Sequence, residues 1–206
     1  MDELLALGWY RMNQTIFTAS HIGLERIHRV HWLRYSLGEI RIHASHKRIR
    51  MRNRNASYTI EDFTSVHADY ADLHRRYRAS INFDGALSIE ECLFGEEGLG
   101  KNRYNTKCVS IFDQGNLVAG GYFDVGNRAA ASILHFFDPR YKRNSLGKYL
   151  ILITIDYLRA NRYEFYYPGY VVEGNNKMDY KLFLGKEEAQ YFDPETVTWK
   201  YFHEST

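Results

Sequence analysis

The sequence predicts an α/β fold in which a central, mostly antiparallel mixed sheet is flanked by helices. Three β-rich runs follow one another, separated by hairpin-type turns at residues 114–116 and 126–128. A helical pattern and one further apolar run then complete a strand–helix–strand unit. The β-rich runs are residues 107–112, 117–125 and 129–137, the helix opens at Ser145, and the last strand is residues 164–167.

Length and composition indicate a globular chain with a sizeable core. Its 206 residues are 45% apolar, which suits one compact domain or two small lobes. The early acidic pair of the N-terminus does not fit a signal peptide, and no segment approaches the ~18 apolar residues that span a bilayer. We therefore expect a soluble, cytoplasmic protein with no membrane partner. Its oligomeric state stays open.

The first part of the chain, residues 1–58, is predicted as a β-rich, basic region. A short helical turn at residues 1–7 precedes a strand at residues 9–21. A second strand follows at residues 30–42, where Gly38 marks a bulge.

Metal binding is not expected. Cys92 and Cys108 are the only cysteines and form no CxxC motif, which also argues against a disulfide framework. On a strand, the odd separation of His28 and His31 places these side chains on opposite faces.

The most basic stretch of the chain is residues 41–54, which contain no acid. Arg48, Arg50 and Arg52 recur at every second position, so a strand would align their guanidinium groups on one face. Such a row suits a phosphate backbone, whose contacts are salt-sensitive and blind to sequence. The alternative is a solvated sheet face that acids of the next helix balance.

Two helices are predicted between this stretch and the β-rich runs. The first opens with Thr59 as its N-cap and ends near Arg78. The second opens at Ser88, which fits a capping box, and continues through Phe94. The Gly- and charge-rich residues 95–105 are expected to form a surface loop that could cover a site.

The loop before the helix at Ser145 is basic. Arg140, Lys142 and Arg143 surround a helix N-terminus, whose free N–H groups suit a phosphate or another anion. The strand at residues 164–167 breaks at Pro168, so this strand and the one before the helix, residues 129–137, would be splayed apart there. An ordinary βαβ unit with a solvated loop is the alternative. In the tail, residues 185–206, we expect a turn at Asp193 and packing of aromatic side chains on the core.

Four short motifs occur in this part of the chain in a fixed order. They are Phe137-Asp138-Pro139, Ser145-Leu146-Gly147-Lys148-Tyr149, Tyr167-Pro168-Gly169-Tyr170 and Lys177-Met178-Asp179-Tyr180-Lys181. Together they resemble the C-terminal half of the aminoacyl-tRNA–protein transferases, the arginyl- and leucyl-transferases of the N-degron pathway. The resemblance implies a GNAT-like acyltransferase core over residues 59–206.

The implied reaction moves arginine or leucine from tRNA to the N-terminal α-amine of a protein or peptide, with Asp or Glu as its first residue. Aminoacyl-tRNA would be the co-substrate, and no cofactor is implied. By resemblance, the donor would meet Arg143, Ser145, Leu146, Gly147 and Tyr149, the aminoacyl group would meet Tyr167, Gly169 and Tyr170, and the site would be closed by Lys177, Met178, Tyr180 and Lys181. The resemblance also favours a tRNA contact for the arginine row.

The sequence departs from the family at two places. Pro168 stands where the family more often has leucine, which affects the hydrogen bonding of that strand. Residues 20–34 contain no cysteine, although the family carries there a cluster that can bind a metal or an iron–sulfur centre.

Aminoacyl esters are already activated, so the main tasks of such an enzyme are positioning the reactants and stabilising the oxyanion. A base could help to remove the amine proton, and Asp138 is the first candidate, with Asp124 second. Asp138 could instead be a turn residue before Pro139. An acidic acceptor would require a cation, for which Arg140, Arg143 and Lys177 are candidates.

Two other functions remain open. An acyl-CoA-dependent N-acetyltransferase would use the same fold, although its phosphate loop is usually richer in glycine than residues 143–147. A non-catalytic RNA-binding relative is the second alternative.

Overall fold

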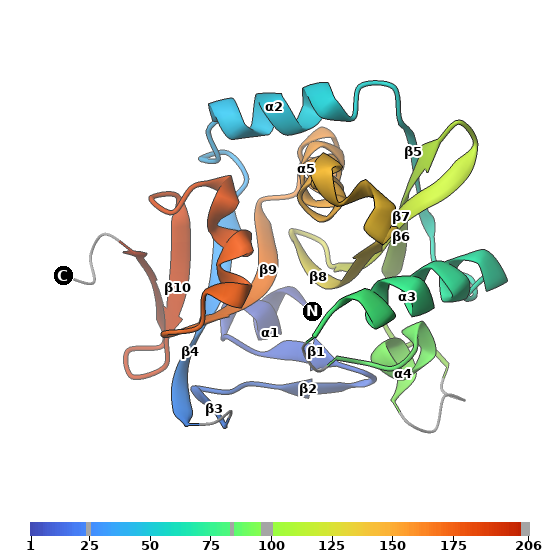
Figure 1. Ribbon diagram of the computed structural model, residues 1–206. Helices are drawn as coiled ribbons and strands as arrows, with labels where there is room; N and C mark the ends of the chain where they lie inside the picture. Colours follow the sequence, from blue (N-terminus) through green and yellow to red (C-terminus); the bar gives the residue numbers. More distant parts are fainter. Residues whose placement is uncertain (24–25, 83–84, 96–100, 203–206) are drawn as a thin grey trace.

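The computed structural model describes residues 1–23, 26–82, 85–95 and 101–202 (Figure 1). The strands are β1 (Tyr10–Met12), β2 (Thr15–Phe17), β3 (His21–Gly23), β4 (Ile27–Ser36), β5 (Ser57–Asp62), β6 (Thr106–Asp113), β7 (Asn116–Val125), β8 (Ala129–Phe137), β9 (Phe165–Val172), β10 (Ala189–Asp193) and β11 (Thr198–Tyr201). The helices are α1 (Asp2–Ala6), α2 (Ala44–Arg52), α3 (Ala68–Ser80), α4 (Ile89–Phe94) and α5 (Leu146–Ala160), and two 3-10 segments are η1 (Pro139–Asn144) and η2 (Asn176–Leu184).

One large sheet organises the described part of the chain. Eight of its nine strands follow the order β11-β10-β4-β9-β8-β7-β6-β5, and the ninth, β3, pairs with β4 beside this path. Neighbouring strands are antiparallel except for β8 and β9, which are parallel and are joined by α5. An antiparallel meander followed by a strand–helix–strand unit is the arrangement of a GNAT-like core, so the predicted fold class is confirmed. Strands from residues 1–58 and from residues 59–206 belong to the same sheet.

Helices cover both faces of this sheet (Figure 1). Phe123 of β7 packs in the core cluster of α5, whereas its neighbour Tyr122 packs in a cluster with Leu73 of α3. Successive strand residues point to opposite faces, so α5 and α3 lie on opposite sides of the sheet.

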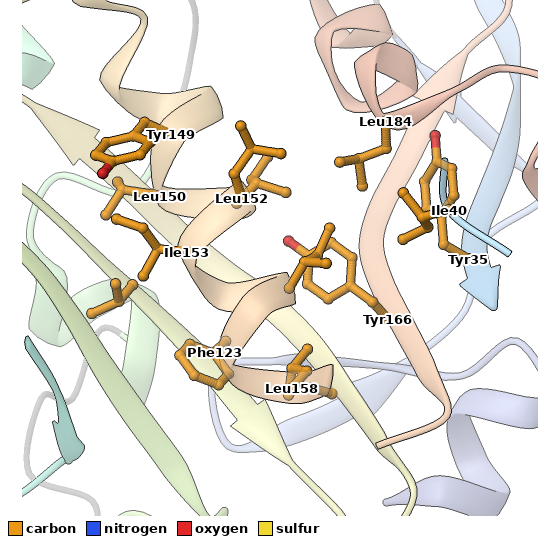
Figure 2. Packing of buried hydrophobic residues seen from close by; sticks show 14 of the residues in the cluster. Tyr35, Ile40, Phe123, Tyr149, Leu150, Leu152, Ile153, Leu158, Tyr166 and Leu184 are labelled. Atoms are coloured by element: carbon orange, nitrogen blue, oxygen red, sulfur yellow. The ribbon is translucent and has the colours of Figure 1, made fainter. Parts of the chain in front are cut away.

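The larger core lies between α5 and the sheet (Figure 2). Nine of the 15 residues of α5 are buried. Leu150 and Ile153 lie on the side of the helix that faces Phe123, and Leu152 lies on the side that faces Tyr166 and Leu184 (Figure 2). Each such aliphatic side chain contributes about 1.5–3 kcal/mol by leaving water. This packing fixes the N-terminus of α5 relative to β8 and β9.

The arginine row lies on a helix, so the predicted strand is wrong. Residues 44–52 form α2, and the buried side chains of this segment, His46, Ile49 and Asn53, recur at helical spacing. Arg48 and Arg52 are four residues apart and share a helix face, whereas Arg50 points away from them. The short alternation of Arg with other residues was compatible with both structures, and packing of α2 against α5 decides between them.

The helix predicted from Thr59 also begins elsewhere. Residues 57–62 are the edge strand β5, which pairs with β6, and α3 begins only at Ala68. Thr59 and Ile60 are β-branched, so pairing with β6 outweighs the cap-like signal of the following acids. The second predicted helix is confirmed, because the Ser88 side chain accepts a hydrogen bond from the backbone N–H of Glu91 at the start of α4.

Three strand boundaries differ from the prediction. Residues 9–21 contain the hairpin β1–β2 instead of one strand, because Asn13 takes a positive φ of 57° and turns the chain. Gly38 lies in a turn after β4, and the bulge lies between Leu33 and Tyr35. β9 continues through Pro168 to Val172, because it stays paired with β4. The predicted covering loop includes residues 96–100, which lie outside the described residues.

Candidate functional site

The loop between β8 and α5 brings a basic surface to the N-terminus of α5. Asp138 caps η1, its carboxylate accepting from the backbone N–H of Arg140 at 3.0 Å. Ser145 then adopts a left-handed conformation, with φ 55° and ψ 43°, and α5 starts at the next residue. The positive end of the α5 dipole is therefore aimed at the surface beside Arg143.

Part of α2 completes this surface. Asn53 donates to the carbonyl oxygen of Asn144 at 2.9 Å, and Arg52 donates to that of Arg143 at 3.3 Å. A surface pocket of about 640 Å³ lies here, lined by Arg52, Lys142, Arg143, Asn144 and Ser145. We call these five residues the basic pocket. Its positive charge and its place beside the N-terminus of α5 suit a phosphate.

The three arginines of the predicted row have different surroundings. Arg52 lines the basic pocket, and Arg48 is exposed on the same face of α2. Arg50 instead forms a bidentate ion pair with Asp156 of α5, at 2.6 and 2.9 Å. This pair helps to hold α2 on α5, so Arg50 is less free than Arg52 to bind an anion.

A second group of predicted residues lies where β8 and β9 separate. These strands pair only from Ala129 with Phe165 to Ala131 with Tyr167, and β9 then continues with β4 alone. The predicted splaying of the two strands is therefore confirmed. Gly169 lies two residues beyond Tyr167, the last residue of β9 that pairs with β8. Its φ of +100° is one that residues other than glycine rarely adopt.

Lys181 reaches this separation from η2. Its Nζ donates to the carbonyl oxygen of Tyr170 at 2.8 Å and lies 3.7 Å from Met178 Sδ. A Cβ added at Gly169 would come within 3.3 Å of the same nitrogen, so the glycine leaves room for it. Only 9% of Lys181 is exposed. Burial lowers the pKa of Lys181 to about 8.

His135 of β8 also belongs to this group, and the sequence analysis did not select it. Its Nε2 lies 3.2 Å from Ser132 Oγ. Burial, and to a lesser degree the charge of Lys181, lowers the pKa of His135 to about 4. His135 is therefore neutral near pH 7. A polar side chain within the apolar run of β8 was the available signal.

The two proposed bases do not lie together. Asp138 is held by the guanidinium group of Arg140 at 2.7 Å, and this contact lowers its pKa. Asp124 is fully buried near the other end of β7, where Arg11 at 2.8 Å and Thr106 at 2.5 Å bind it. Both carboxylates are engaged in contacts that stabilise the fold, and Asp124 is not brought to the group around Lys181.

The other predicted residues divide between the core and the site. Leu146 and Tyr149 are buried in the core cluster around α5. Tyr167 is buried in a different core cluster, where its ring centroid lies 5.5 Å from that of Trp199. Gly147 lies beside Phe137, since a Cβ there would meet that ring at 3.7 Å. The packing of Trp199 also confirms the predicted docking of the tail.

The residues that close the site come from η2. Tyr180 is 41% exposed, and Met178 is half-buried beside Lys181. The side chain of Lys177 lies outside the described residues. Within the described part of the chain, no cluster of His, Cys, Asp or Glu could hold a metal ion, and no helix could span a membrane.

Known proteins resemble this chain over most of its length. A family model described as arginine-tRNA-protein transferase, C terminus, matches residues 62–190. The chain is 29% identical over 182 residues to an aspartate/glutamate leucyltransferase from Shewanella sp. (strain MR-7), covering 87% of this chain and 74% of the relative. It is 27% identical over 199 residues to an aspartate/glutamate leucyltransferase from Methylobacterium nodulans, covering 91% and 79%.

Among solved structures, L-PGS from Bacillus licheniformis superposes with a TM-score of 0.48 and 14% identity, over 69% of this chain and 46% of that one. The chain thus spans about half of that structure, and the likeness is too weak to bear on function. The family match covers well over half of the chain and includes β6 to β9 and α5. This chain belongs to the arginine-tRNA-protein transferase family, a family of aminoacyl-tRNA–protein transferases.

Proposed function

We propose that this chain transfers leucine or arginine from aminoacyl-tRNA to the N-terminal α-amine of a protein or peptide that begins with Asp or Glu. The names of its relatives support this reaction, and they place leucine first in any test. The proposal includes a cytoplasmic location, where charged tRNA is found, and requires no cofactor besides the donor.

One observation carries the proposal. The basic pocket at the N-terminus of α5 lies at the same end of β8 as the separation from β9, because Gly147 approaches Phe137 at the end of β8. A phosphate of the tRNA acceptor end at Arg143 would leave the aminoacyl ester near the separated strands. Positioning of this kind accounts for much of the rate enhancement in acyl transfer.

The reaction itself needs few protein groups. The neutral α-amine attacks the ester carbonyl, the new C–N bond forms, and the C–O bond to the ribose breaks. One proton passes from the amine to the ribose oxygen. An α-amine has a pKa of about 7.7–8.0, so part of it is already neutral near pH 7. Asp138 and Asp124 are engaged by arginines, so we assign neither of them the role of base here.

The direct test supplies labelled leucyl- and arginyl-tRNA together with peptides that begin with Asp, Glu or Ala. Label should enter the acidic peptides. Turnover of acetyl-CoA without transfer from tRNA would instead identify an acetyltransferase. Binding of tRNA without any transfer would identify a non-catalytic RNA-binding protein.

A matched pair of variants tests the basic pocket. Replacing Arg52 and Arg143 by Ser should weaken tRNA binding and reduce the slope of log affinity against log salt by about 1–2, because fewer phosphates are neutralised. The control is Arg75→Ser, since Arg75 lies on α3, across the sheet, and is paired with Asp72. Equal affinity of the double variant and the control would refute this assignment.

A further inference from the structure

The group around Lys181 contains a buried cation without a carboxylate partner. No acid of the described residues forms an ion pair with Lys181, although 91% of this residue is removed from solvent. The ammonium group contacts the carbonyl oxygen of Tyr170 and Met178 Sδ, and it lies 4.9 and 5.8 Å from the ring centroids of Tyr170 and Tyr180. A buried ammonium usually has an anionic partner, because burial of an uncompensated charge costs several kcal/mol.

The position of this ammonium is set by three elements. Lys181 is anchored on η2, where the hydroxyl of Tyr35 from β4 donates to its backbone carbonyl at 3.1 Å. Gly169 of β9 leaves room for Nζ, and His135 of β8 lies close enough for its pKa to be affected by the charge. The ammonium is therefore held on β9, beyond the last residues that pair with β8, and its charge acts on His135 of β8.

We propose that Lys181 binds the side-chain carboxylate of the acidic first residue of the acceptor. This inference rests on the proposed function and deepens it, since it identifies the residue that selects the acceptor class. An ammonium has three N–H donors, and Tyr170 uses one of them. A charge-assisted bond to a carboxylate would use another and would compensate the buried charge. Lys181 would thus take the role for which Lys177, Arg140 and Arg143 were the candidates in the sequence, and Arg140 is engaged with Asp138.

The lysine also has a structural role, which the test must separate from recognition. Lys181→Gln keeps an N–H donor for Tyr170 and removes the charge, whereas Lys181→Met removes both. The control is Lys186→Gln, because Lys186 is exposed and lies near the ring of Phe202. All variants are compared by their Tm, so that unfolding is not mistaken for loss of recognition.

The measurements are the affinity for peptides that begin with Asp, Glu, Asn or Gln, and kcat/KM for transfer to them. Asp and Asn are nearly equal in size, so their ratio reports the charge. We expect Lys181→Gln to lower the preference for Asp over Asn at least about tenfold, which corresponds to the loss of one charge-assisted contact. The affinity for tRNA should stay unchanged, and Lys186→Gln should behave as the wild type.

Two results would overturn this inference. An equal loss of kcat/KM for all four peptides would show that Lys181 acts on the donor or on the oxyanion. An unchanged preference for Asp in folded Lys181→Gln would show a structural role only. The peptide affinities also distinguish the two proposals. If the wild type transfers nothing but prefers Asp over Asn through Lys181, the acceptor site stands and the proposed reaction fails.

Discussion

Replacing Lys181 by Met should change how the stability of the protein depends on pH. The pKa of Lys181 falls from an ordinary value of 10.5 to about 8 in the folded protein because of burial. Below about pH 8 both states carry the proton, and the folded state bears a cost of about 3 kcal/mol for the buried charge. Between about pH 8 and 10.5 the unfolded state binds more protons than the folded state, so the stability of the wild type rises with pH.

The size of the effect follows from these two pKa values. From about pH 7 to about pH 9.5 the wild type should gain about 2 kcal/mol relative to Lys181→Met. The groups that face Lys181 do not titrate in this range when folded, since the pKa of His135 lies at about 4 and desolvation of the hydroxyl groups raises the pKa values of Tyr35, Tyr170 and Tyr180. Other groups contribute equally to both proteins and cancel in the difference.

Urea unfolding of both proteins at the two pH values measures this difference directly. At pH 7 the Met variant should be about as stable as the wild type or more stable, because the lost hydrogen bond to Tyr170 is offset by removal of the buried charge. A difference between the two proteins that does not change with pH would refute the reasoning. It would mean that Lys181 is solvated in the folded state and is not poised to bind a carboxylate.

Three further predictions follow, two for the scaffold and one for the proposed acceptor site. Arg11→Met should destabilise the protein by about 3–5 kcal/mol in urea unfolding, because it leaves the buried Asp124 carboxylate with Thr106 as its remaining hydrogen-bond partner. The control is Arg128→Met, which breaks an exposed ion pair with Glu164 and should cost under about 1 kcal/mol. Ser88→Ala should cost about 1 kcal/mol by removing the cap of α4, and no measurable loss would contradict that cap. Gly169→Val should abolish transfer at unchanged tRNA affinity, since its φ is strained for a side chain and its Cβ would crowd Lys181; retained transfer would refute the placement of the acceptor.

The parts of the fold that could be predicted have strong periodic patterns. α5 has apolar residues at helical spacing, and the hairpin between β6 and β7 turns at Gln114 and Gly115, both with positive φ. Both features are local, so the sequence is sufficient to show them. The order of strands around β4 could not be predicted, because β4 lies between β9 and β10 and both pairings span more than 100 residues.

The α2 helix shows why local reasoning failed at the basic stretch. Its buried stripe consists of His46, Ile49 and Asn53, and two of these three residues count as polar in a sequence. The tertiary structure satisfies them, since His46 bonds to the carbonyl oxygen of Phe183 and Asn53 bonds to that of Asn144. Without knowledge of these partners, the arginines were the more conspicuous pattern.

The candidate site was predicted only in part, because the chemistry of its residues also depends on tertiary contacts. The motif order identified Gly169 and Lys181, but the chemistry of Lys181 depends on its burial, which no local pattern shows. The role of Asp138 as a turn residue was one of two alternatives, and its contacts with Arg140 favour that alternative. His135 was missed because Lys181, whose charge acts on it, lies far away in the sequence and comes near only in the folded chain.

The separation of β8 and β9 follows from two adjacent residues of β9. Pro168 has no N–H, so β9 cannot donate there to a neighbouring strand, and the ladder with β8 ends at the residue before it. Gly169 then turns the backbone with a positive φ, and the carbonyl oxygen of Tyr170 accepts from Lys181 in the absence of pairing with β8. The lysine thus satisfies a backbone group that the separation of the strands leaves unpaired. If Lys181 also binds the acidic acceptor, as we propose, support of the strand and recognition of the acid depend on one ammonium group.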